Sequence, residues 1–216
     1  MTDEHLMRRQ IVELGASLFQ RGFSVGSAGN ISARIDGGFL MTPTNSSLGR
    51  LKADELSVLT QDWEHVGGPR PSKEVVMHRA MYEARPEAQA IVHLHSTYVT
   101  AYSCLAGEAG IPPLTPYFVM RLGREVPTVP YYRPGAAEML EDILAAGRRS
   151  PGVILSNHGS IVAGSTVEDA VNAAEELESR LSWPSSWRAG RPVRSAPDRS
   201  MICSAESGHH RLPHHL

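Results

Sequence analysis

The sequence has 216 residues, a formal net charge of -2 at pH 7 and a pI near 6.5. This length suits one domain of ordinary size, large enough to bury well over half of the surface that the unfolded chain exposes. The small net charge excludes a global electrostatic basis for binding nucleic acid or an anionic membrane, so any bound anion must be held by a local site.

The cysteine content and the hydropathy pattern indicate the cellular setting of the protein. Only two cysteines occur, Cys104 and Cys203, and the first ten residues lack the apolar core of a secretion signal. No apolar run approaches the roughly 20 residues that span a bilayer. We therefore expect a reducing, cytoplasmic setting, with neither nucleic acid nor a membrane as a partner.

The N-terminal part of the chain predicts a helix followed by two strands. Apolar residues recur at intervals of four, three and four, at Met7, Ile11, Leu14 and Leu18. This stripe indicates an amphipathic helix over residues 4–21 that ends near Gly22. Residues 24–35 pass from a glycine-containing turn into an alternating strand, and residues 37–49 offer a second short strand that breaks at a Pro/Thr/Asn/Ser loop.

A second helix, of about three turns, is predicted over residues 72–85. Ser72 is a suitable N-cap, Glu74 lies in the first turn and Pro86 follows the end. The helix leads directly into AIVHLHSTY, residues 90–98, whose apolar run indicates a strand.

Two histidines, His93 and His95, stand one residue apart in this predicted strand. Alternate side chains of a strand point to the same face, so the two imidazoles are expected side by side, with Val92 and Leu94 packing the other way. A lone histidine in an apolar strand is usually a hydrogen-bonded core residue, and that alternative stays open for each. Two buried imidazoles on one face are costly without a metal or an acidic partner, so the pair favours a metal site.

The second half of the chain mixes helices with short strands. We expect helices over residues 98–107, 133–149 and 166–180, a strand over residues 125–132, and two short strands within residues 152–164. Thr166 is a suitable cap for the last helix. Strands mixed with helices over some 180 residues indicate an α/β layered domain, which we place at residues 1–181.

Residues 182–216 differ in character from the rest of the chain. Pro, Ser, Arg and His dominate, and no apolar period survives. We expect a poorly ordered tail. Its four histidines, at positions 209, 210, 214 and 215, are interpreted as part of an exposed end, with adventitious metal binding as the alternative.

A third histidine, His158, lies at the turn Asn157-His158-Gly159 between two predicted strands, where an imidazole can project into a cleft. With His93 and His95 it would supply three nitrogen ligands. Three histidines with an open fourth position are typical of a catalytic zinc site, because a substrate oxygen or water can still reach the ion. Imidazole also suits other divalent first-row ions, which remain alternatives to zinc.

Glu74 is the candidate acid/base. The alternative is an ordinary first-turn glutamate that complements the helix dipole. We interpret His78, one helical turn further on, as a packing or hydrogen-bonding residue. The loops at residues 26–30 and 42–47 have the small and hydroxylated residues that an anion site needs, although by themselves they are turns.

Five motifs occur in a fixed order, and they are GSAGNIS, MTPT, PSKE, HLH and NHG. This ordered set resembles the class II aldolase/adducin family over about residues 5–180. The resemblance implies a three-layer α/β/α class II aldolase domain with a central, mainly antiparallel sheet. The segments PYFVMRLG and PYYRPG are similar to the 3-oxo-tetronate 4-phosphate decarboxylases within that family.

The resemblance also implies roles for individual residues. His93, His95 and His158 would bind zinc, and Glu74 would ligate it in the resting state and act as acid/base when substrate displaces it. The implied phosphate pocket consists of Asn30, Thr44, Asn45, Ser72 and Lys73. Many relatives have glycine where Asn45 stands, but asparagine tolerates left-handed backbone angles, so we expect the turn to survive.

Several polar residues in the subgroup-like segments are candidates for recognising the leaving carboxylate. They are Tyr117, Tyr131, Tyr132 and Arg133. Arg133 is the more specific candidate, because a guanidinium grips a carboxylate through two parallel hydrogen bonds. The alternative is a solvated arginine beside a Pro-Gly turn.

The implied reaction is zinc-dependent decarboxylation of 3-oxo-tetronate 4-phosphate to dihydroxyacetone phosphate and CO2. Two alternatives remain: a fuculose-phosphate-type class II aldolase, and a non-catalytic, adducin-like binding module. The family further implies a homotetramer with active sites near subunit interfaces. Its members usually continue as a regular helix beyond the position of Glu178 and often cover the active site with the C-terminal segment, and here the tail departs from that pattern.

Overall fold

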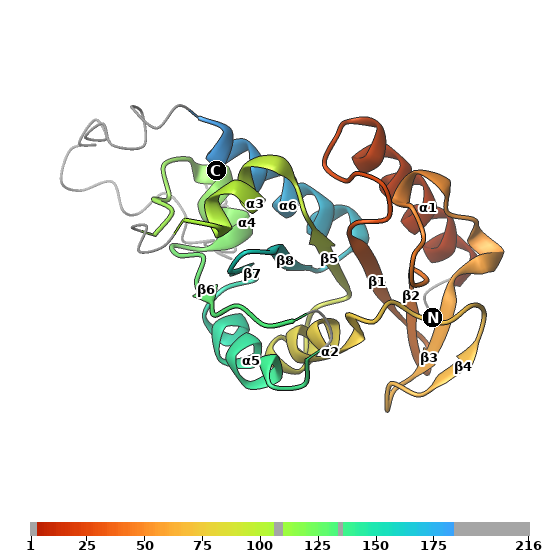
Figure 1. Ribbon diagram of the computed structural model, residues 1–216. Helices are drawn as coiled ribbons and strands as arrows, with labels where there is room; N and C mark the ends of the chain where they lie inside the picture. Colours follow the sequence, from red (N-terminus) through yellow and green to blue (C-terminus); the bar gives the residue numbers. More distant parts are fainter. Residues whose placement is uncertain (1–3, 106–109, 134–135, 184–216) are drawn as a thin grey trace, which may run out of the picture.

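The computed structural model describes residues 4–105, 110–133 and 136–183, which form a single sheet with helices on both faces (Figure 1). The sheet has eight strands in the order β4-β3-β2-β1-β5-β8-β7-β6, and neighbours are antiparallel except for the parallel pair β6 and β7. The strands are β1 (Asn30–Ile35), β2 (Gly38–Met41), β3 (Ser57–Thr60), β4 (His65–Gly67), β5 (Ala90–Leu94), β6 (Thr128–Val129), β7 (Gly152–Leu155) and β8 (Gly159–Gly164). The α/β class with a mainly antiparallel sheet is confirmed.

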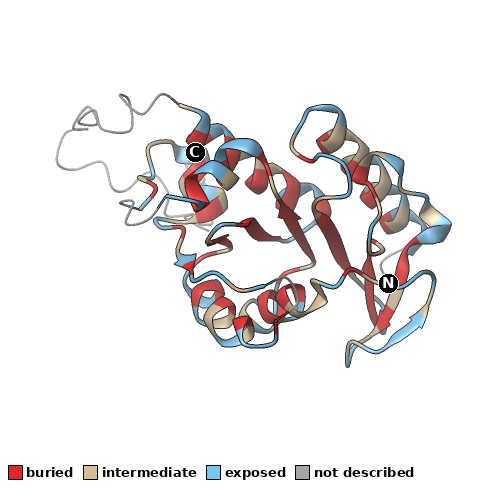
Figure 2. Ribbon diagram, viewed as in Figure 1, coloured by how far each residue is buried: buried red, intermediate tan, exposed pale blue. Residues whose placement is uncertain are grey.

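Helices complete the two outer layers. They are α1 (Glu4–Gln20), α2 (Val75–Ala84), α3 (Thr97–Ser103), α4 (Pro116–Leu122), α5 (Met139–Arg149) and α6 (Val167–Ser182), with short 3-10 turns η1 (Leu48–Arg50) and η2 (Ala53–Glu55). Helices α2 and α5 cover one face of the sheet, and α1, α3, α4 and α6 cover the other (Figure 1). Each layer closes over its own apolar core, so the buried residues lie between helices and strands (Figure 2).

The amphipathic stripe of α1 is confirmed, because Met7, Ile11 and Leu18 are buried in the core against the sheet. Gly22, just beyond the helix, has a φ of 80°, which suits glycine in the turn that ends it. Thr166 also acts as expected: its side chain accepts a hydrogen bond from Asp169 N at 3.0 Å and caps α6.

Several element boundaries differ from the predictions. Helix α2 begins at Val75, so Glu74 rather than Ser72 occupies the N-cap position. Strand β5 ends at Leu94, one residue before His95, and α5 starts at Met139, six residues later than expected. The division at residue 181 falls one residue before the end of α6 at Ser182, and residues 184–216 of the predicted tail, with its histidines, lie outside the described residues.

Three elements were not predicted at all, namely β3, β4 and α4. The sequence does mark the start of helix α4, with the N-cap residue Thr115 followed by Pro116 in the first turn. Thr115 accepts a hydrogen bond from Phe118 N at 3.1 Å. Strand β4 is a short, exposed edge strand and carries little apolar pattern. Within the described ranges, no helix combines the length and the apolar character needed to cross a membrane.

Candidate metal centre and active site

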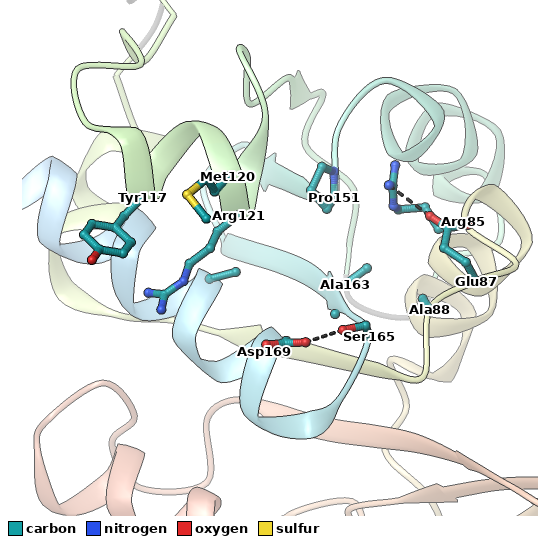
Figure 3. A pocket seen from close by; sticks show the side chains of 12 residues that line it. Arg85, Glu87, Ala88, Tyr117, Met120, Arg121, Pro151, Ala163, Ser165 and Asp169 are labelled. Carbon is teal, nitrogen blue, oxygen red and sulfur yellow. Dashed lines mark hydrogen bonds and ion pairs between the residues drawn. The ribbon is translucent and has the colours of Figure 1, made fainter. Parts of the chain in front are cut away.

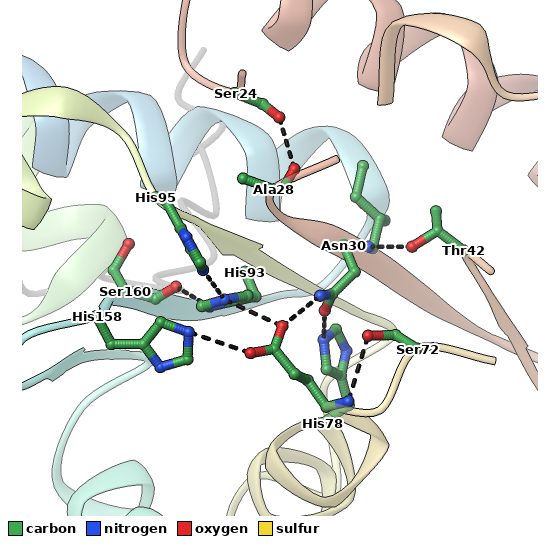
Figure 4. A network of polar contacts seen from close by, with 12 residues as sticks. Ser24, Ala28, Asn30, Thr42, Ser72, His78, His93, His95, His158 and Ser160 are labelled. Carbon is green, nitrogen blue, oxygen red and sulfur yellow. Dashed lines mark hydrogen bonds and ion pairs between the residues drawn. The ribbon is translucent and has the colours of Figure 1, made fainter. Parts of the chain in front are cut away.

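Four side chains from separate segments converge beside β5. They are Glu74 before α2, His93 at the end of β5, His95 just after it, and His158 in the turn between β7 and β8; one ligand atom from each lies within 4.8 Å of the others. The sheet explains the convergence, because β5 lies between β1 and β8, and His93 is paired with Asn30 on one side and Ile161 on the other. The three histidines approach one another around a common point (Figure 4).

The His-x-His pair lies side by side, as the sequence predicts, although His95 is outside the strand. The Nε2 atoms of His93 and His95 are 2.8 Å apart. The opposite ring nitrogen of His93, Nδ1, lies 2.8 Å from the carbonyl oxygen of Ser160 in β8. A carbonyl only accepts, so Nδ1 carries the hydrogen and Nε2 presents a lone pair to the cluster.

The turn that carries His158 is tightly constrained. Asn157 has a φ of 55°, and a Cβ at Gly159 would lie only 2.3 Å from the carbonyl oxygen of Leu94. The backbone N–H of His158 donates to Ser103 Oγ at 3.2 Å, which fixes the turn against α3. The ring Nε2 of His158 is buried without a hydrogen bond of suitable geometry, while Glu74 Oε1 lies 3.1 Å away. Such an orphaned nitrogen fits a metal ligand.

Glu74 turns into the cluster rather than capping its own helix. Its side chain makes no capping hydrogen bond and is only 12% exposed. Oε2 accepts a hydrogen bond from Asn30 Nδ2 at 2.7 Å and lies 3.3 Å from His93 Nε2. The alternative of an ordinary surface glutamate at the helix start is therefore wrong.

The charge states in the cluster match those of a ligand set. Burial favours the neutral form of Glu74, but the neighbouring His93 and His158 rings and the Asn30 amide outweigh it and hold the pKa of this carboxyl well below its ordinary value. Burial lowers the pKa of His93 to about 3, and burial followed by the nearby His158 lowers the pKa of His95. These shifts favour the carboxylate form of Glu74 and the neutral forms of His93 and His95, which are the forms that bind a metal.

The separations between ligand atoms also fit a small divalent ion. Bonds of about 2.0–2.1 Å in a tetrahedral shell set neighbouring ligand atoms roughly 3.3–3.4 Å apart. The atom pairs described above lie 2.8 to 3.3 Å apart. A cluster of three imidazoles and a carboxylate able to bind a metal is therefore present, with the four ligand atoms all within 4.8 Å of one another.

The residues of the implied phosphate pocket gather around the base of Glu74. Two loops are tied together there, because Thr44 N donates to Arg70 O at 3.0 Å and Ser72 N donates to Thr42 O at 3.2 Å. Ser72 Oγ in turn accepts from Glu74 N at 3.2 Å. Ser72 therefore lies next to Glu74, and Thr44 lies on the loop that is paired with the Ser72 segment.

The remaining members of that set are placed differently. Asn45 and Lys73 are exposed, whereas Asn30 is buried. Asn45 has a φ of 59°, so it adopts the left-handed conformation expected of a residue that replaces glycine in this turn. Asn30 contacts Glu74 directly, a contact that the sequence did not indicate.

The candidates for carboxylate recognition do not contact the four-ligand cluster within the described residues. Tyr132 donates its hydroxyl to Asp142 Oδ2 at 2.5 Å, and this bond raises the pKa of the phenol. Tyr131 and Arg133 are exposed on the segment that follows β6. Tyr117 is exposed on α4, where the guanidinium of Arg121 lies 5.8 Å from its ring centre.

A surface pocket of about 500 Å³ adjoins Tyr117 but is separate from the metal ligands (Figure 3). It lies at the Gly164 end of β8, whereas His93 contacts the Ser160 end. Its arginines are already engaged: Arg85 pairs with Glu87, and Arg121 faces Glu176 at 4.0 Å. The pocket therefore does not belong to the candidate active site.

Two further residues lie behind the cluster: His78, whose interpretation as a packing or hydrogen-bonding residue is confirmed, and Glu178, which sequence reasoning missed. His78 is fully buried and lies 2.5 Å from Asn30 Oδ1 through its Nε2 atom. Glu178 is buried on α6 and accepts hydrogen bonds from the segment directly after His95. The spacing of one helical turn between Glu74 and His78 indicated that both lie on the same helix face. No local pattern indicated the contacts of Glu178.

Comparison with known proteins shows the family to which this chain belongs. Residues 9–183 match the model of the Class II Aldolase and Adducin N-terminal domain, and the chain belongs to that family. It is 49% identical to the 3-oxo-tetronate 4-phosphate decarboxylase of Pectobacterium atrosepticum, over 82% of this chain and 83% of that protein. It is 31% identical to the L-fuculose phosphate aldolase of Escherichia coli K12, over 82% and 81% of the two chains.

Solved structures agree with the sequence relatives. YgbL from Klebsiella pneumoniae superposes with a TM-score of 0.80 at 48% identity, over 84% of this chain and 89% of that chain. An L-fuculose 1-phosphate aldolase gives a TM-score of 0.78 at 26% identity, over 89% and 91%. The class II aldolase fold is thus shared with both groups of enzymes.

Proposed function

We propose that this protein is a carboxy-lyase that converts 3-oxo-tetronate 4-phosphate to dihydroxyacetone phosphate and CO2 in the breakdown of four-carbon sugar acids. The observation that carries the proposal is the four-ligand cluster of Glu74, His93, His95 and His158 in a chain 43–49% identical to five decarboxylases of that name. Similarity at this level over four fifths of the chain supports a common substrate.

The cofactor in this proposal is Zn²⁺, held by His93, His95 and His158 with Glu74 as the fourth ligand at rest. Buried neutral imidazoles whose orientation is fixed by the backbone support this assignment. When bound, the ion supplies a Lewis acid that stabilises the negative charge developing on the substrate's oxygen atoms. Another divalent first-row ion would serve the same role.

Glu74 is the proposed acid/base of the reaction. A 3-oxo acid loses CO2 when the electrons of the breaking carbon–carbon bond flow into the adjacent carbonyl, and a proton must then replace CO2 on carbon. The Glu74 carboxylate, 12% exposed and aimed into the cluster, is placed to carry that proton. Asn30, through its 2.7 Å contact, orients the carboxylate for this task.

The phosphate group is proposed to lie on the loops beside Glu74, held by Asn30, Thr44, Asn45, Ser72 and Lys73. Exposed Lys73 supplies positive charge at the pocket's edge, and the amide nitrogen of Asn30 has a second hydrogen besides the one directed at Glu74. We further propose that Arg133 grips the leaving carboxylate. Tyr132 belongs to the same segment, but its hydroxyl is engaged by Asp142.

A sugar-phosphate aldolase is the second candidate, supported by 31% identity to L-fuculose phosphate aldolases. Cleavage of a carbon–carbon bond next to the same kind of ketone places the same demands on the ligands and on Glu74, so the cluster serves both reactions. An adducin-like module without catalysis would have no need of three imidazoles that converge with a carboxylate. A cytoplasmic homotetramer completes the proposal.

The test is a product assay on zinc-loaded protein. With 3-oxo-tetronate 4-phosphate we expect stoichiometric release of CO2 and dihydroxyacetone phosphate, lost in Glu74→Gln and retained in Glu83→Gln. Glu83 is a matched control, because it lies on the same helix but pairs with Arg79 at the surface. If only fuculose 1-phosphate were cleaved, the aldolase proposal would replace the decarboxylase proposal. If neither substrate reacted, both proposals would be overturned.

A further inference from the structure

A line of buried polar side chains extends from Glu74 away from the metal ligands. Asn30 and Ser32 lie two residues apart on β1, and Glu74, His78 and Tyr82 follow one another at four-residue intervals along the start and face of α2. Side chains at these spacings share one face of a strand and one face of a helix. The two rows alternate, so each group contacts the next, and Asn30 and His78 lie between Glu74 and the core (Figure 4).

The contacts in this line are short. Asn30 Oδ1 lies 2.5 Å from His78 Nε2, and His78 Nδ1 lies 2.7 Å from Ser32 Oγ. Ser32 Oγ in turn lies 3.3 Å from the hydroxyl of Tyr82. The exposed fractions of His78, Ser32 and Tyr82 are 0%, 0% and 4%, so bulk water has little access to these hydrogen bonds.

The charge of Glu74 fixes the direction of the hydrogen bonds that join Glu74, Asn30 and His78. A carboxylate only accepts, so the atom of Asn30 that faces it must be the NH2 group. The amide oxygen then faces His78, which must carry its hydrogen on Nε2. Burial lowers the pKa of His78 to about 4, so the ring is neutral at pH 7 and its Nδ1 is a bare acceptor. Ser32 fills it by donating its hydroxyl hydrogen.

The opposite orientation of the Asn30 amide is excluded by its contact with Glu74. If the amide of Asn30 were turned around, two acceptor oxygens would lie 2.7 Å apart, at Asn30 and Glu74. That arrangement also needs the hydrogen of His78 on Nδ1. The tautomer of His78 and the orientation of the Asn30 amide are therefore linked, and only one combination suits an ionised Glu74.

We propose that His78 is a positioning residue for the reaction: by holding its hydrogen on Nε2 it locks the Asn30 amide with the NH2 group toward Glu74. His78 contacts Asn30 and Ser32, and it acts on Glu74 through Asn30. The role rests on the proposed function of Glu74, whereas the tautomer follows from the hydrogen-bonding pattern whatever the substrate is.

The first test reads the tautomer directly. In zinc-loaded protein labelled with 15N at histidine, long-range 1H–15N correlation at pH 7 should show His78 with a protonated Nε2 and an unprotonated Nδ1. The signal is assigned by its loss in His78→Gln, or by its shift in Ser32→Ala if the first variant does not fold. A proton on Nδ1, or on both nitrogens, would overturn the proposal without bearing on the reaction catalysed.

The second test separates positioning from folding. We expect His78→Leu to lower kcat at least about tenfold, with zinc content unchanged and KM within a factor of about two, because the transition state loses more than the bound substrate does. His78→Gln, whose side-chain NH2 can still donate to Asn30 Oδ1, should recover part of that loss. Met81→Ala is the control: it removes buried volume from the same helix and leaves the polar line intact.

Loss of stability without loss of kcat in His78→Leu, or an equal kcat loss in Met81→Ala, would reduce His78 to a structural residue. The kinetic comparison uses whichever substrate the unaltered enzyme turns over, so failure of the decarboxylase assignment does not decide it.

Discussion

Glu178 accepts a hydrogen bond from Ser96 Oγ at 2.8 Å across 82 residues of sequence. The same buried carboxylate accepts from the backbone N–H groups of Tyr98 and Val99, each at 2.8 Å. These donors form the first turn of α3, which begins two residues after His95. Because Ser103 at the other end of α3 accepts from the His158 backbone, one anchor on α6 supports two of the candidate metal ligands, His95 and His158.

Replacing Glu178 should weaken metal binding more than it destabilises the rest of the fold. In Glu178→Gln, either amide orientation places an NH2 group against a backbone N–H donor and leaves a buried donor unsatisfied, at a cost of about 1–3 kcal/mol. We expect about a tenfold loss of Zn²⁺ affinity, measured by competition with a fluorescent chelator.

Glu176→Gln is the matched control, because Glu176 accepts from Thr115 at the start of α4, which carries no ligand. Equal affinity losses in both variants would remove Glu178 from any particular role in the metal centre.

Removing a ligand should abolish metal binding. His158→Ala and His93→Ala are each expected to lower bound zinc to below about a tenth of an equivalent, measured by elemental analysis after dialysis, because two imidazoles and a carboxylate hold the ion far less tightly than the full set. His65→Ala, at an exposed position on β4, should bind zinc normally. Full occupancy in both ligand variants would place the metal elsewhere.

The metal-free protein should lose stability in mild acid. The pKa of His78 is lowered by burial from 6.5 to about 4, so between these values the unfolded chain binds more protons than the folded one. The free energy of unfolding therefore falls as the pH drops from about 6.5 to about 4, and His78 contributes roughly 3 kcal/mol to that fall. Urea titrations in the presence of a chelator measure it.

His78→Gln has no titrating group at this position and should show a shallower pH dependence over the same range. An unchanged slope would mean that His78 is protonated in the folded protein.

The turn between β7 and β8 should tolerate no side chain at Gly159. A Cβ there would lie 2.3 Å from the carbonyl oxygen of Leu94, in the strand that carries His93. We expect Gly159→Ala to cost about 1–3 kcal/mol or more and to lower zinc affinity, because the two strands must separate. Gly110→Ala, with no atom within 4 Å of the added carbon, should be neutral in thermal denaturation. Identical melting temperatures for both would show that the turn can shift freely.

Local patterns in the sequence predicted the helices that have a clear apolar stripe or a clear N-cap residue. The apolar period of α1 and the Thr166 cap are examples, and the pairing of His93 with His95 followed from a two-residue repeat. His158 was proposed from its place in a turn between two strands and Glu74 from its place at a helix start, and the family motifs supported both. Long-range contacts were beyond such patterns: the Asn30 bond to Glu74 depends on the register of β1 with β5, and Glu178 reaches a segment some 80 residues away.

The boundary errors have physical causes as well. Ser72 was predicted as the helix cap because serine suits that position. In the structure α2 begins only at Val75, and the intervening residues place Glu74 at the N-cap position, where its side chain faces the histidines. Strand β4 was missed because a three-residue edge strand with mostly exposed side chains has almost no hydropathy signal, and β3 was missed because its alternation covers only four residues.

The central place of β5 has a consequence for synthesis of the chain. Its five buried residues pair with β1, which has already been made, and with β8, which has not: Ser160, the partner of the His93 ring, lies 67 residues further along. At about 5–20 residues per second, ribosomes need roughly 3–13 s to reach it. Throughout that interval an apolar strand edge is open to neighbouring nascent chains, so a stalled or truncated product ending between β5 and β8 is the species most in need of a chaperone.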